Sequence, residues 1–409
     1  MKPTGPIPPD YGVVGGELAI AGRPANAWAA EAGDTPLFVY DRAITDARVA
    51  AFRASHPPDL GLHYAIKANP YPPLLRHMLG RVDGLDVASA GELRIALAAG
   101  AGPEHISFAG PGKRDDDLRE AVAAGVTLNC ESEGEAARTL RVARELGRTP
   151  RIAVRVNPPF ELKGSGMRMG GGAKPFGVDA ERVPALVRTL LDGGADWRGF
   201  HIFAGSQSLN ADAITAAQAN AIALAAELAE AVGAAPPLVN LGGGYGVPYF
   251  PGDDPLDIAR VGAALGDALG IRRPVLKDSR FAIELGRFLV AEAGVYLTRV
   301  LDRKESGGRT FLVTDGGLHH QLAASGNFGQ VIRRNFPVTI ATRFSEPATV
   351  PATIVGCLCT PLDILADDVA VPAATGEGDL VAVFLAGAYG LSASPQAFLS
   401  QRPAREILA

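Results

Sequence analysis

The sequence predicts an α/β protein in which a (β/α)8 barrel is followed by a mostly antiparallel C-terminal β domain, joined by the N-terminal segment. From about residue 61 to residue 285, short apolar runs alternate with segments rich in Ala, Leu and Glu, which is the pattern of βα repetition. After residue 285 the pattern changes to β-branched strands without regular helices between them. A chain of 409 residues is long enough for a full barrel and a smaller second domain.

Eight apolar runs are the expected barrel strands. In chain order they are LHYAIKA, GLDVAS, ISFAG, TLNCES, RIAVRVN, GFHIFAG, LVNLGGG and RFAIELG, with helices such as residues 90–99 and 133–146 between them. An open doubly wound sheet is the alternative, and it would place its Gly-rich turn after the first strand. Here the Gly-rich turn follows the seventh run, which favours the closed barrel.

We expect three parts along the chain. Residues 1–36 form strands that join the β domain, residues 37–285 form the barrel, and residues 286–409 form the β domain. Within the barrel, residues 160–177 read FELKGSGMRMGGGAKPFG, which is too rich in glycine for a helix and too long for an ordinary βα loop. We expect this segment to be a mobile lid or a dimer loop.

The composition excludes several classes of function. With 47% hydrophobic residues, 20% charged residues and a net charge of -5, the chain has the composition of an ordinary globular protein. It contains no basic block or aromatic-basic stripe, so we expect neither nucleic acid nor a membrane as a partner. The N-terminus lacks the apolar core of a signal peptide, and the long helix around residues 213–235 carries two glutamates. We therefore expect a cytoplasmic protein.

The cysteines and histidines predict no metal site and no disulfide framework. Only Cys130, Cys357 and Cys359 are present, and they are not spaced as a metal-binding set. His319 and His320 are adjacent and lack a partner spaced for a tetrahedral site. They either line a cleft as polar residues or contact a substrate.

Charged residues and glycines recur where the expected strands end. In a barrel, the chemistry gathers at the carboxyl ends of the strands. In chain order these ends carry Lys67, Asp86, Arg155, Phe203 with Gly205 and Ser206, Gly242 to Gly244, Glu284 and Arg287. Such a recurrence indicates a functional site at this end of the barrel.

Lys67 in HYAIKANP follows a buried strand and allows two interpretations. Its charge could reach water just past the strand end. Alternatively, its pKa is lowered in a pocket, where the amine acts as a nucleophile that forms a Schiff base.

The loop NLGGGYG, residues 240–246, indicates which ligand that amine would meet. Three glycines alone make only a tight turn, but the loops after strands seven and eight of a barrel commonly hold phosphate with backbone N–H groups and a helix N-terminus. Arg287 could add a bidentate contact. Pyridoxal 5′-phosphate (PLP) carries a phosphate, an aldehyde and a ring nitrogen that must stay protonated. Glu284 is placed to hold that proton, although it could instead form a salt bridge at the barrel rim.

A set of ordered motifs extends this interpretation. YAIKANP, GLDVASAGEL, FAGPGK, RVNP, HIFAGSQ, NLGGGYG, IELGR, CLCTPLD and AGAYG occur in that order. Together they resemble the fold-type III, alanine racemase-like PLP-dependent decarboxylases, the group of diaminopimelate, ornithine and arginine decarboxylases. The resemblance covers nearly the whole chain. It implies a barrel with a β domain and a head-to-tail homodimer in which both chains build each active site.

The resemblance also implies roles for individual residues. It makes Lys67 the Schiff-base lysine, Glu284 the partner of the pyridine nitrogen, and the partner subunit's Cys359 the proton donor to the substrate carbon. Racemases of this fold place an arginine where Glu284 stands, so the glutamate favours decarboxylation. The implied cofactor contacts are Lys67, Asp86, Arg155, Phe203, Ser206, Gly242, Gly243, Gly244, Glu284, Gly286, Arg287 and Tyr389.

The expected substrate pocket departs from the family pattern. Thr360 stands where an acidic residue usually follows the catalytic cysteine, and Asp363 is a candidate to compensate. Ala323 and Asn327 stand in the segment where diaminopimelate decarboxylases hold the far end of the substrate with an Arg-Pro and a tyrosine. Phe203 replaces a histidine that stacks on the cofactor.

His201, two residues before Phe203, should point to the same side of its strand and also belongs to the expected pocket.

These variants are similar to those of the exosortase A-associated decarboxylases and of the butirosin decarboxylase that acts on glutamate tethered to an acyl-carrier protein. We therefore expect α-decarboxylation of a free amino acid or of an aminoacyl group on a carrier protein. A diaminopimelate decarboxylase that makes lysine is the main alternative. A PLP-dependent racemase and a non-catalytic PLP-binding protein are further alternatives.

Overall fold

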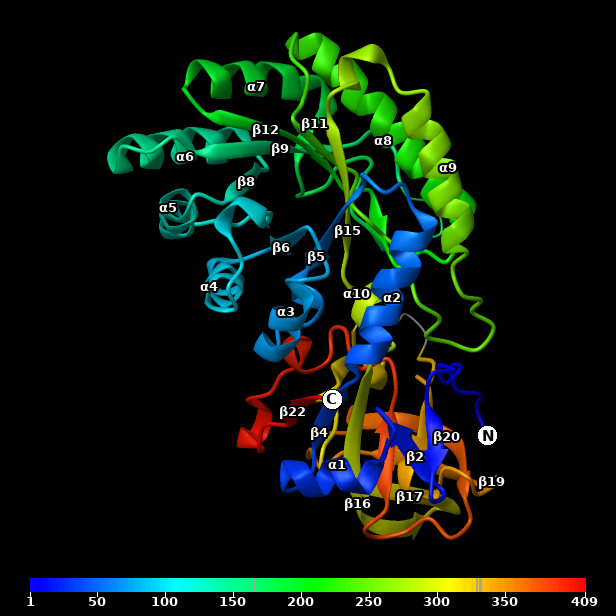
Figure 1. Ribbon diagram of the computed structural model, residues 1–409. Helices are drawn as coiled ribbons and strands as arrows, with labels where there is room; N and C mark the ends of the chain where they lie inside the picture. Colours follow the sequence, from blue (N-terminus) through cyan, green and yellow to red (C-terminus); the bar gives the residue numbers. More distant parts are fainter. Residues whose placement is uncertain (163, 165, 329, 331–332) are drawn as a thin grey trace. The chain divides into compact units, whose positions relative to one another are not determined.

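The structure is a computed structural model that describes residues 1–162, 164, 166–328, 330 and 333–409 (Figure 1). It divides into two compact units. The barrel unit comprises Val49–Val247 and Pro255–Gly286, and the β unit comprises Met1–Arg48, Pro248–Asp254 and Arg287–Ala409. The helix α2 (Arg42–Ser55) contains one of the boundaries between them.

The barrel unit is built on a closed sheet of parallel strands. In order around the barrel they are β5 (Gly61–Ala65), β6 (Gly84–Val87), β7 (Ile106–Phe108), β8 (Thr127–Cys130), β9 (Arg151–Asn157), β12 (Asp196–Ile202), β14 (Leu238–Asn240) and β15 (Arg280–Leu285). The pairing of β15 with β5 closes the ring, and a short strand, β11 (Val178–Asp179), pairs with β9. All eight runs expected to be barrel strands are strands, so the predicted barrel is confirmed.

Helices follow the barrel strands and begin at residues that the sequence marks. They are α3 (Pro72–Met78), α4 (Ala90–Ala98), α5 (Asp115–Ala124), α6 (Glu133–Leu146), α7 (Val183–Asp192), α8 (Ala211–Val232) and α9 (Ile258–Gly270). The Ser89 hydroxyl accepts a hydrogen bond from the backbone N–H of Glu92, and Ser132 does the same for Glu135. These caps start α4 and α6 directly after β6 and β8, which keeps the strand ends clear of helix. None of the helices in the described part of the chain has both the length and the apolar character that a membrane span requires.

The β unit contains a sheet of β4 (Leu37–Tyr40), β16 (Gly294–Ser306), β17 (Arg309–Thr314), β18 (Val338–Ile340), β19 (Ala348–Val355), β20 (Ile364–Pro372), β21 (Leu380–Val383) and β22 (Arg405–Leu408). Most pairs are antiparallel, as expected, but β17 with β19 and β22 with β4 are parallel. The sheet is therefore mixed.

The N-terminal segment joins the β unit in a different way from the one expected. β1 (Gly12–Val14), β2 (Glu17–Ile20) and β3 (Arg23–Pro24) form a separate small sheet, followed by α1 (Ala25–Ala32). Leu18 and Ile20 of β2 pack in one hydrophobic core with Val295 and Phe384. The strand β4, which we expected in the barrel, pairs with β16 instead, so the boundary expected after residue 36 lies too early. Its apolar sequence LFVY fits either sheet, and only long-range pairing assigned it.

The glycine-rich segment of residues 160–177 is partly a ribbon. β10 (Met167–Arg168) pairs with β13 (Gly205–Ser206) in an antiparallel register. Lys163 and Ser165 lie outside the described residues. The role of the segment as a lid or a dimer loop stays a prediction.

Candidate active site

Lys67 lies next to a buried carboxylate at the carboxyl end of the barrel. It belongs to a 3-10 turn, η1 (Ile66–Ala68), that directly follows β5. Its Nζ is 3.9 Å from Oε1 of Glu284 on the neighbouring strand β15, and its side chain is 41% exposed. The amine is thus partly open to solvent and lies beside a carboxylate, and its role as a Schiff-base nucleophile stays a prediction.

Glu284 is buried and is held in its charged form. Its Oε2 accepts a hydrogen bond of 2.9 Å from Nε2 of His201. Burial raises the pKa of Glu284, but this hydrogen bond and the charges of Lys67, His201 and Arg155 outweigh it and lower the pKa to about 2. The barrel mouth therefore carries a fixed anion. The Nδ1 atom of His201 is buried without a hydrogen-bond partner in the described chain.

Phe203 offers a flat apolar surface beside the lysine. It follows β12, and its ring centroid lies 5.7 Å from Nζ of Lys67. The ring lies 6.3 Å from that of His201, with 26° between the two planes. An aromatic side chain here can stack on a planar ligand but cannot exchange a proton with it.

Asp86 at the end of β6 faces a histidine that our sequence analysis did not select. Its Oδ2 is 3.5 Å from Nδ1 of His63 on β5. Burial and the charge of Glu284 raise the pKa of Asp86, and His63 opposes them. Burial lowers the pKa of His63, but the charges of Asp86 and the other nearby carboxylates raise it by more. The net shift of the His63 pKa is therefore upward. The two groups form a buried carboxylate–imidazole pair near Glu284.

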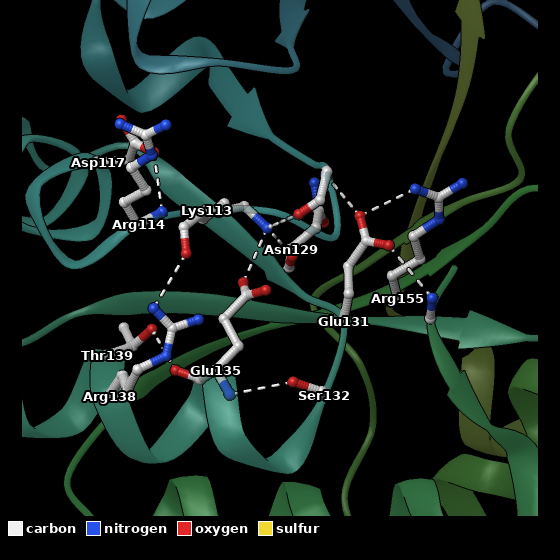
Figure 2. Close-up of polar contacts among 12 residues, drawn as sticks. Lys113, Arg114, Asp117, Asn129, Glu131, Ser132, Glu135, Arg138, Thr139 and Arg155 are labelled. Atoms are coloured by element: carbon white, nitrogen blue, oxygen red, sulfur yellow. Dashed lines mark hydrogen bonds and ion pairs between the residues drawn. The ribbon is translucent and has the colours of Figure 1, made fainter. Parts of the chain in front are cut away.

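Arg155 is anchored by a carboxylate at the end of β8 (Figure 2). Its Nη1 donates to Oε1 of Glu131 at 2.9 Å, and both side chains are buried. Glu131 also accepts from the backbone N–H groups of Gly110 and Gly177. Burial raises the pKa of Glu131, but the charges of Arg155 and Lys113 and these hydrogen bonds lower it overall. Arg155 is therefore oriented by a carboxylate that is itself firmly held.

A second buried ion pair lies beside the first (Figure 2). Nζ of Lys113 is 2.8 Å from Oε1 of Glu135 and donates to the carbonyl oxygens of Gly110 and Asn129. It fixes the loop after β7 against β8 and α6. Arg138 of α6 donates to the Lys113 carbonyl at 3.0 Å. This cluster holds Glu131, and through it Arg155, in place.

The glycine loop after β14 is packed too closely for any side chain. Gly242 and Gly244 have φ values of +68° and +92°. A Cβ atom on Gly243 would lie 1.9 Å from the carbonyl oxygen of Glu284. The backbone N–H of Glu284 donates to the Gly242 carbonyl, and the Asn240 amide oxygen accepts from the Gly242 N–H. The loop is thus tied to the strand that carries the anion.

The loop differs from the expected phosphate cradle in one respect. We expected a helix N-terminus next to it, but α9 begins only at Ile258. Any anion contact from this loop would rest on its backbone N–H groups. Ser206 lies in β13. Two residues later, Ser208 donates its backbone N–H to the Gly244 carbonyl at 2.9 Å.

Arg287 and Tyr389 come together in the β unit. The guanidinium carbon of Arg287 is 4.8 Å from the ring centroid of Tyr389, and its Nη1 donates to the Tyr249 hydroxyl at 3.3 Å. Tyr389 has a φ of +54°, which is uncommon for a tyrosine. The placement of both residues relative to the glycine loop stays a prediction. Gly286 ends the barrel unit, and a Cβ there would lie 3.0 Å from the Ala68 Cβ of η1.

The two cysteines of CLCTPLD differ in exposure. Cys359 is exposed, whereas Cys357 is half-buried and its thiol lies 3.6 Å from the carbonyl oxygen of Asp315. Burial, together with the charges of Asp363 and Asp315, raises the pKa of Cys357. Cys357 is thus the packing cysteine, and Cys359 is free to meet a ligand.

Asp363 is not available to a substrate amine, and our expectation that it compensates for Thr360 is wrong. Its side chain is buried, and its two carboxylate oxygens accept from the backbone N–H groups of Leu318 and Leu358 at 2.6 and 2.9 Å. A Cβ atom on Gly317 or Gly356 would lie 2.2 Å from this carboxylate. Asp363 therefore joins two loops of the β unit.

The segment that would hold the far end of a substrate carries no charge at the two selected positions. Ala323 lies in a 3-10 turn, η5 (Leu322–Ser325), and the exposed Asn327 donates its side-chain amide to the Ser325 hydroxyl at 2.8 Å. His319 and His320 are fully buried, so neither lines an open cleft. Burial lowers the pKa of both histidines to about 4.

Three polar residues in the barrel unit were not predicted from the sequence. Glu131 and Lys113 are buried and His63 is partly buried. His63 faces Asp86, Glu131 binds Arg155, and Lys113 binds Glu135. Glu131 directly follows β8, so the rule that selected Asp86 and Glu284 would have found it as well. Lys113 stands in the quoted motif FAGPGK, but nothing local indicates that its partner is Glu135 on α6.

The comparisons with known proteins agree with this geometry. The family model described as "Pyridoxal-dependent decarboxylase, pyridoxal binding domain" matches residues 43–291. The chain belongs to this family of PLP-dependent decarboxylases. It is therefore a PLP-dependent carboxy-lyase of the ornithine, arginine and diaminopimelate decarboxylase group.

Individual relatives in this family match over nearly the whole chain. The chain is 37% identical to the "L-glutamyl-[BtrI acyl-carrier protein] decarboxylase" of Niallia circulans, over 92% of this chain and 89% of the relative. It is 32% identical to the diaminopimelate decarboxylase of Methanothermobacter thermautotrophicus, over 96% and 91% of the two chains. The crystal structure of the Helicobacter pylori diaminopimelate decarboxylase complexed with L-lysine has a TM-score of 0.83 and 25% identity, and the match covers 94% of each chain.

The residues of the barrel mouth fit PLP. In the glycine loop the Asn240 side chain accepts the Gly242 N–H, whereas the N–H groups of Gly243 and Gly244 make no hydrogen bond among the described residues and can hold a phosphate. Lys67 supplies an amine that solvent can reach, and Glu284 supplies a buried carboxylate that stays charged. Phe203 supplies an aromatic face beside them. The PLP prediction from the sequence is confirmed by the family.

Proposed function

We propose that this decarboxylase acts on an amino acid whose distal end is long or is joined to a carrier protein. This proposal rests on the hydrogen bonds of the Asp363 carboxylate. Its carboxylate is occupied by two backbone N–H groups, so among the described residues 359–363 no carboxylate is left for a distal ammonium. A free basic amino acid would lose a charge-assisted hydrogen bond that is worth about 1.5–3 kcal/mol.

The relatives support the same substrate class. The Niallia circulans relative is, by its name, a decarboxylase of a glutamyl group on an acyl-carrier protein. An aminoacyl group that is tethered through its side-chain carboxyl keeps the α-carboxylate that is lost as carbon dioxide and has no distal ammonium, which matches Thr360, Ala323 and Asn327 in this chain. A wide, uncharged distal pocket would leave room for the carrier arm.

The residues of the barrel unit perform defined tasks in this reaction. PLP, when bound, supplies the electron sink that accepts the electrons left by departing carbon dioxide. Lys67 would hold the cofactor through its amine. Glu284 would keep a proton on the ring nitrogen, and His201 holds Glu284 in its charged form. Phe203 would offer its ring for stacking on the cofactor.

The proton that replaces the carboxylate comes from a cysteine in our proposal. Cys359 is exposed in the β unit, and the family resemblance makes it the donor in the neighbouring chain's active site. The enzyme would then be a homodimer with shared sites. Mixing Lys67→Ala chains with Cys359→Ala chains would create one intact site per mixed dimer, so activity should return to a fraction of the wild-type value. Two inactive variants that stay inactive after mixing would contradict the shared site.

The proposed substrate is tested by carbon dioxide release from the PLP-loaded enzyme. The panel comprises diaminopimelate, lysine, ornithine, arginine, glutamate, and glutamyl or other aminoacyl groups on a carrier protein. We expect turnover of the carrier-bound groups and little turnover of the free basic amino acids, with Lys67→Ala as the blank. Efficient turnover of a free basic amino acid, with no response to carrier-bound groups, would contradict the proposal.

Diaminopimelate decarboxylation is the second candidate. Several relatives with 30–32% identity carry that name, including those of Aquifex aeolicus and Archaeoglobus fulgidus. This function requires a group other than Asp363 to meet the distal end of the substrate. The same panel separates the two candidates, because diaminopimelate would then be the preferred substrate.

A further inference from the structure

A cavity opens at the end of the barrel opposite Lys67. It has a volume of about 770 Å³, within the range of small-molecule sites. It is lined by the first residues of the barrel strands and by the loops that precede them, all within the barrel unit. One of its polar lining residues is His63, whose imidazole also faces Asp86.

Small side chains leave this end of the barrel hollow. Strands in parallel register point their paired residues to the same face, so each layer of the interior follows from the pairing. Gly61 pairs with Ala282, Gly84 pairs with His63, and Ala153 pairs with Asn129. A barrel core is usually filled by branched apolar residues at these layers. Here the interior is open, and polar side chains take part in its lining.

Two buried amides face this cavity with unused hydrogen-bonding capacity. Asn129 and Asn240 both line the cavity, and only 2% and 4% of their surfaces are exposed. Asn129 donates its amide to Ser107, and Asn240 accepts from the Gly242 N–H. Among the described residues, the side-chain oxygen of Asn129 and the amino group of Asn240 make no hydrogen bond, and neither atom is completely shielded from solvent. Each can therefore bond to water or to a ligand in the cavity.

The opening of the cavity carries an excess of arginine on one side. Arg151, Arg198 and Arg280 begin or lie in strands β9, β12 and β15 and line the cavity. Asp196 lies 3.8 Å from Arg151 and 3.3 Å from Arg198, and for Arg280 no ion pair is recorded among the described residues. Arg151 and Arg198 are close together, because both guanidinium groups lie within 4 Å of the same Asp196 oxygen. Burial and the charge of Arg198 lower the pKa of Arg151, and Asp196 and Glu104 oppose them.

The other charges that line the cavity, Arg53, Asp59, Asp83 and Glu104, lie on other helices, strands and loops than the three arginines. Arg53 also lines the cavity, but it is paired with Asp83 at 2.7 Å. Asp59 and Glu104 also line the cavity and are exposed, as Arg280 is, so solvent screens all three charges. His105 stands beside Glu104 at 3.6 Å and is exposed as well.

We propose that this cavity is a binding site for a small organic anion. The carboxylate or phosphate group of the ligand meets the three arginines at the opening, and its polar remainder reaches the two asparagines inside. Guanidinium groups bind such anions through paired, charge-assisted hydrogen bonds. The site is separate from the decarboxylation site and does not depend on the proposed substrate.

The site is tested by titrating the PLP-loaded enzyme with inorganic phosphate and, separately, with malonate. Calorimetry gives the dissociation constant, and the imidazole resonances of His63 report whether the anion enters the cavity. His63 is assigned by comparison with His63→Gln. We expect saturable binding of at least one anion together with a shift of the His63 signals, and the tighter of the two probes assigns the anionic group. No saturable binding of either anion, or binding that leaves His63 unchanged, would overturn the proposal.

Three variants localise the binding. Arg280→Gln removes an exposed charge at the opening and should weaken binding by about tenfold or more. Ala153→Leu fills the interior without removing a charge and should abolish the His63 shift. Arg144→Gln, an exposed arginine on α6 outside the cavity, is the matched control and should leave binding unchanged. Equal affinity in Arg280→Gln and Arg144→Gln would also overturn the site.

Discussion

The barrel unit and the β unit hold their polar site residues in opposite ways. In the barrel, Glu284 and Arg155 are buried and each has a charged partner. In the β unit, Cys359 and Asn327 are exposed, and the one buried carboxylate described near them, Asp363, is taken by backbone N–H groups. This difference shows that the charged groups at the cofactor end of the barrel are fixed by ion pairs. The selected residues of the β unit can be substituted without breaking an ion pair. We expect cofactor chemistry to depend on the first unit and substrate choice on the second.

The largest effect should come from Lys67→Ala. Removal of the amine that holds the cofactor should lower kcat by roughly three orders of magnitude or more. The free energy of unfolding should change little, because the side chain is 41% exposed. Carbon dioxide release and urea denaturation measure the two quantities. Lys277→Ala, an exposed lysine elsewhere in the barrel unit, is the control. A similar loss of activity in both variants would contradict the assigned role.

The next effect concerns the buried pair that supports Arg155. Lys113→Met leaves the Glu135 carboxylate buried without its cation and should lower the free energy of unfolding by about 3–5 kcal/mol. The double variant Lys113→Met/Glu135→Leu removes both charges and should recover much of that loss. Arg94→Met breaks the exposed pair with Glu120 and should cost no more than about 1 kcal/mol. Equal losses for Lys113→Met and Arg94→Met would show that burial of the pair is unimportant.

Acid should destabilise both units through one buried histidine in each. Burial lowers the pKa of His56 in the barrel unit and of His320 in the β unit to about 4, against 6.5 in an unfolded chain. The unfolded state therefore takes up protons first as the pH falls below 6.5. The stabilisation is complete above pH 6.5 and is lost towards pH 4, by about 2–3 kcal/mol for each histidine.

Chemical denaturation between these pH values measures this dependence. His56→Gln and His320→Gln should each reduce the slope of stability against pH. His56 has a clear structural reason to stay neutral, since its Nε2 lies 2.8 Å from the buried Tyr245 hydroxyl. An unchanged slope in His56→Gln would show that this histidine does not remain neutral in the folded state.

The smallest effect should be a gain in activity on free basic amino acids, produced by a substitution in the β unit. Thr360→Asp places a carboxylate directly after Cys359, where a distal ammonium would meet it. We expect kcat/KM for diaminopimelate or lysine to rise by about tenfold, which corresponds to one charge-assisted hydrogen bond. Thr360→Asn has nearly the same shape without the charge and should give no gain. A gain in both variants, or in neither, would count against the proposed pocket.

The sequence alone determined the order of the barrel strands and the residues at their ends. Strand ends are marked locally, by a buried apolar run followed by a polar residue and a helix cap such as Ser89 or Ser132. A closed parallel barrel then brings those ends to one side whatever the details of packing. For this reason the sequence is enough to place Lys67, Glu284, Phe203 and the glycine loop together.

Only the tertiary structure decided which partner each polar group took. Arg155 met Glu131 and Lys113 met Glu135 because neighbouring strands and helices brought them together, and the sequence contains no local signal for such pairs. Asp363 turned inward to two backbone N–H groups, one of them 45 residues away in the chain. The cavity at the other end of the barrel likewise follows from strand register, which brings small residues from separate strands into the same layers. Contacts of this kind depend on the whole fold, because the two residues of each contact lie far apart in the sequence.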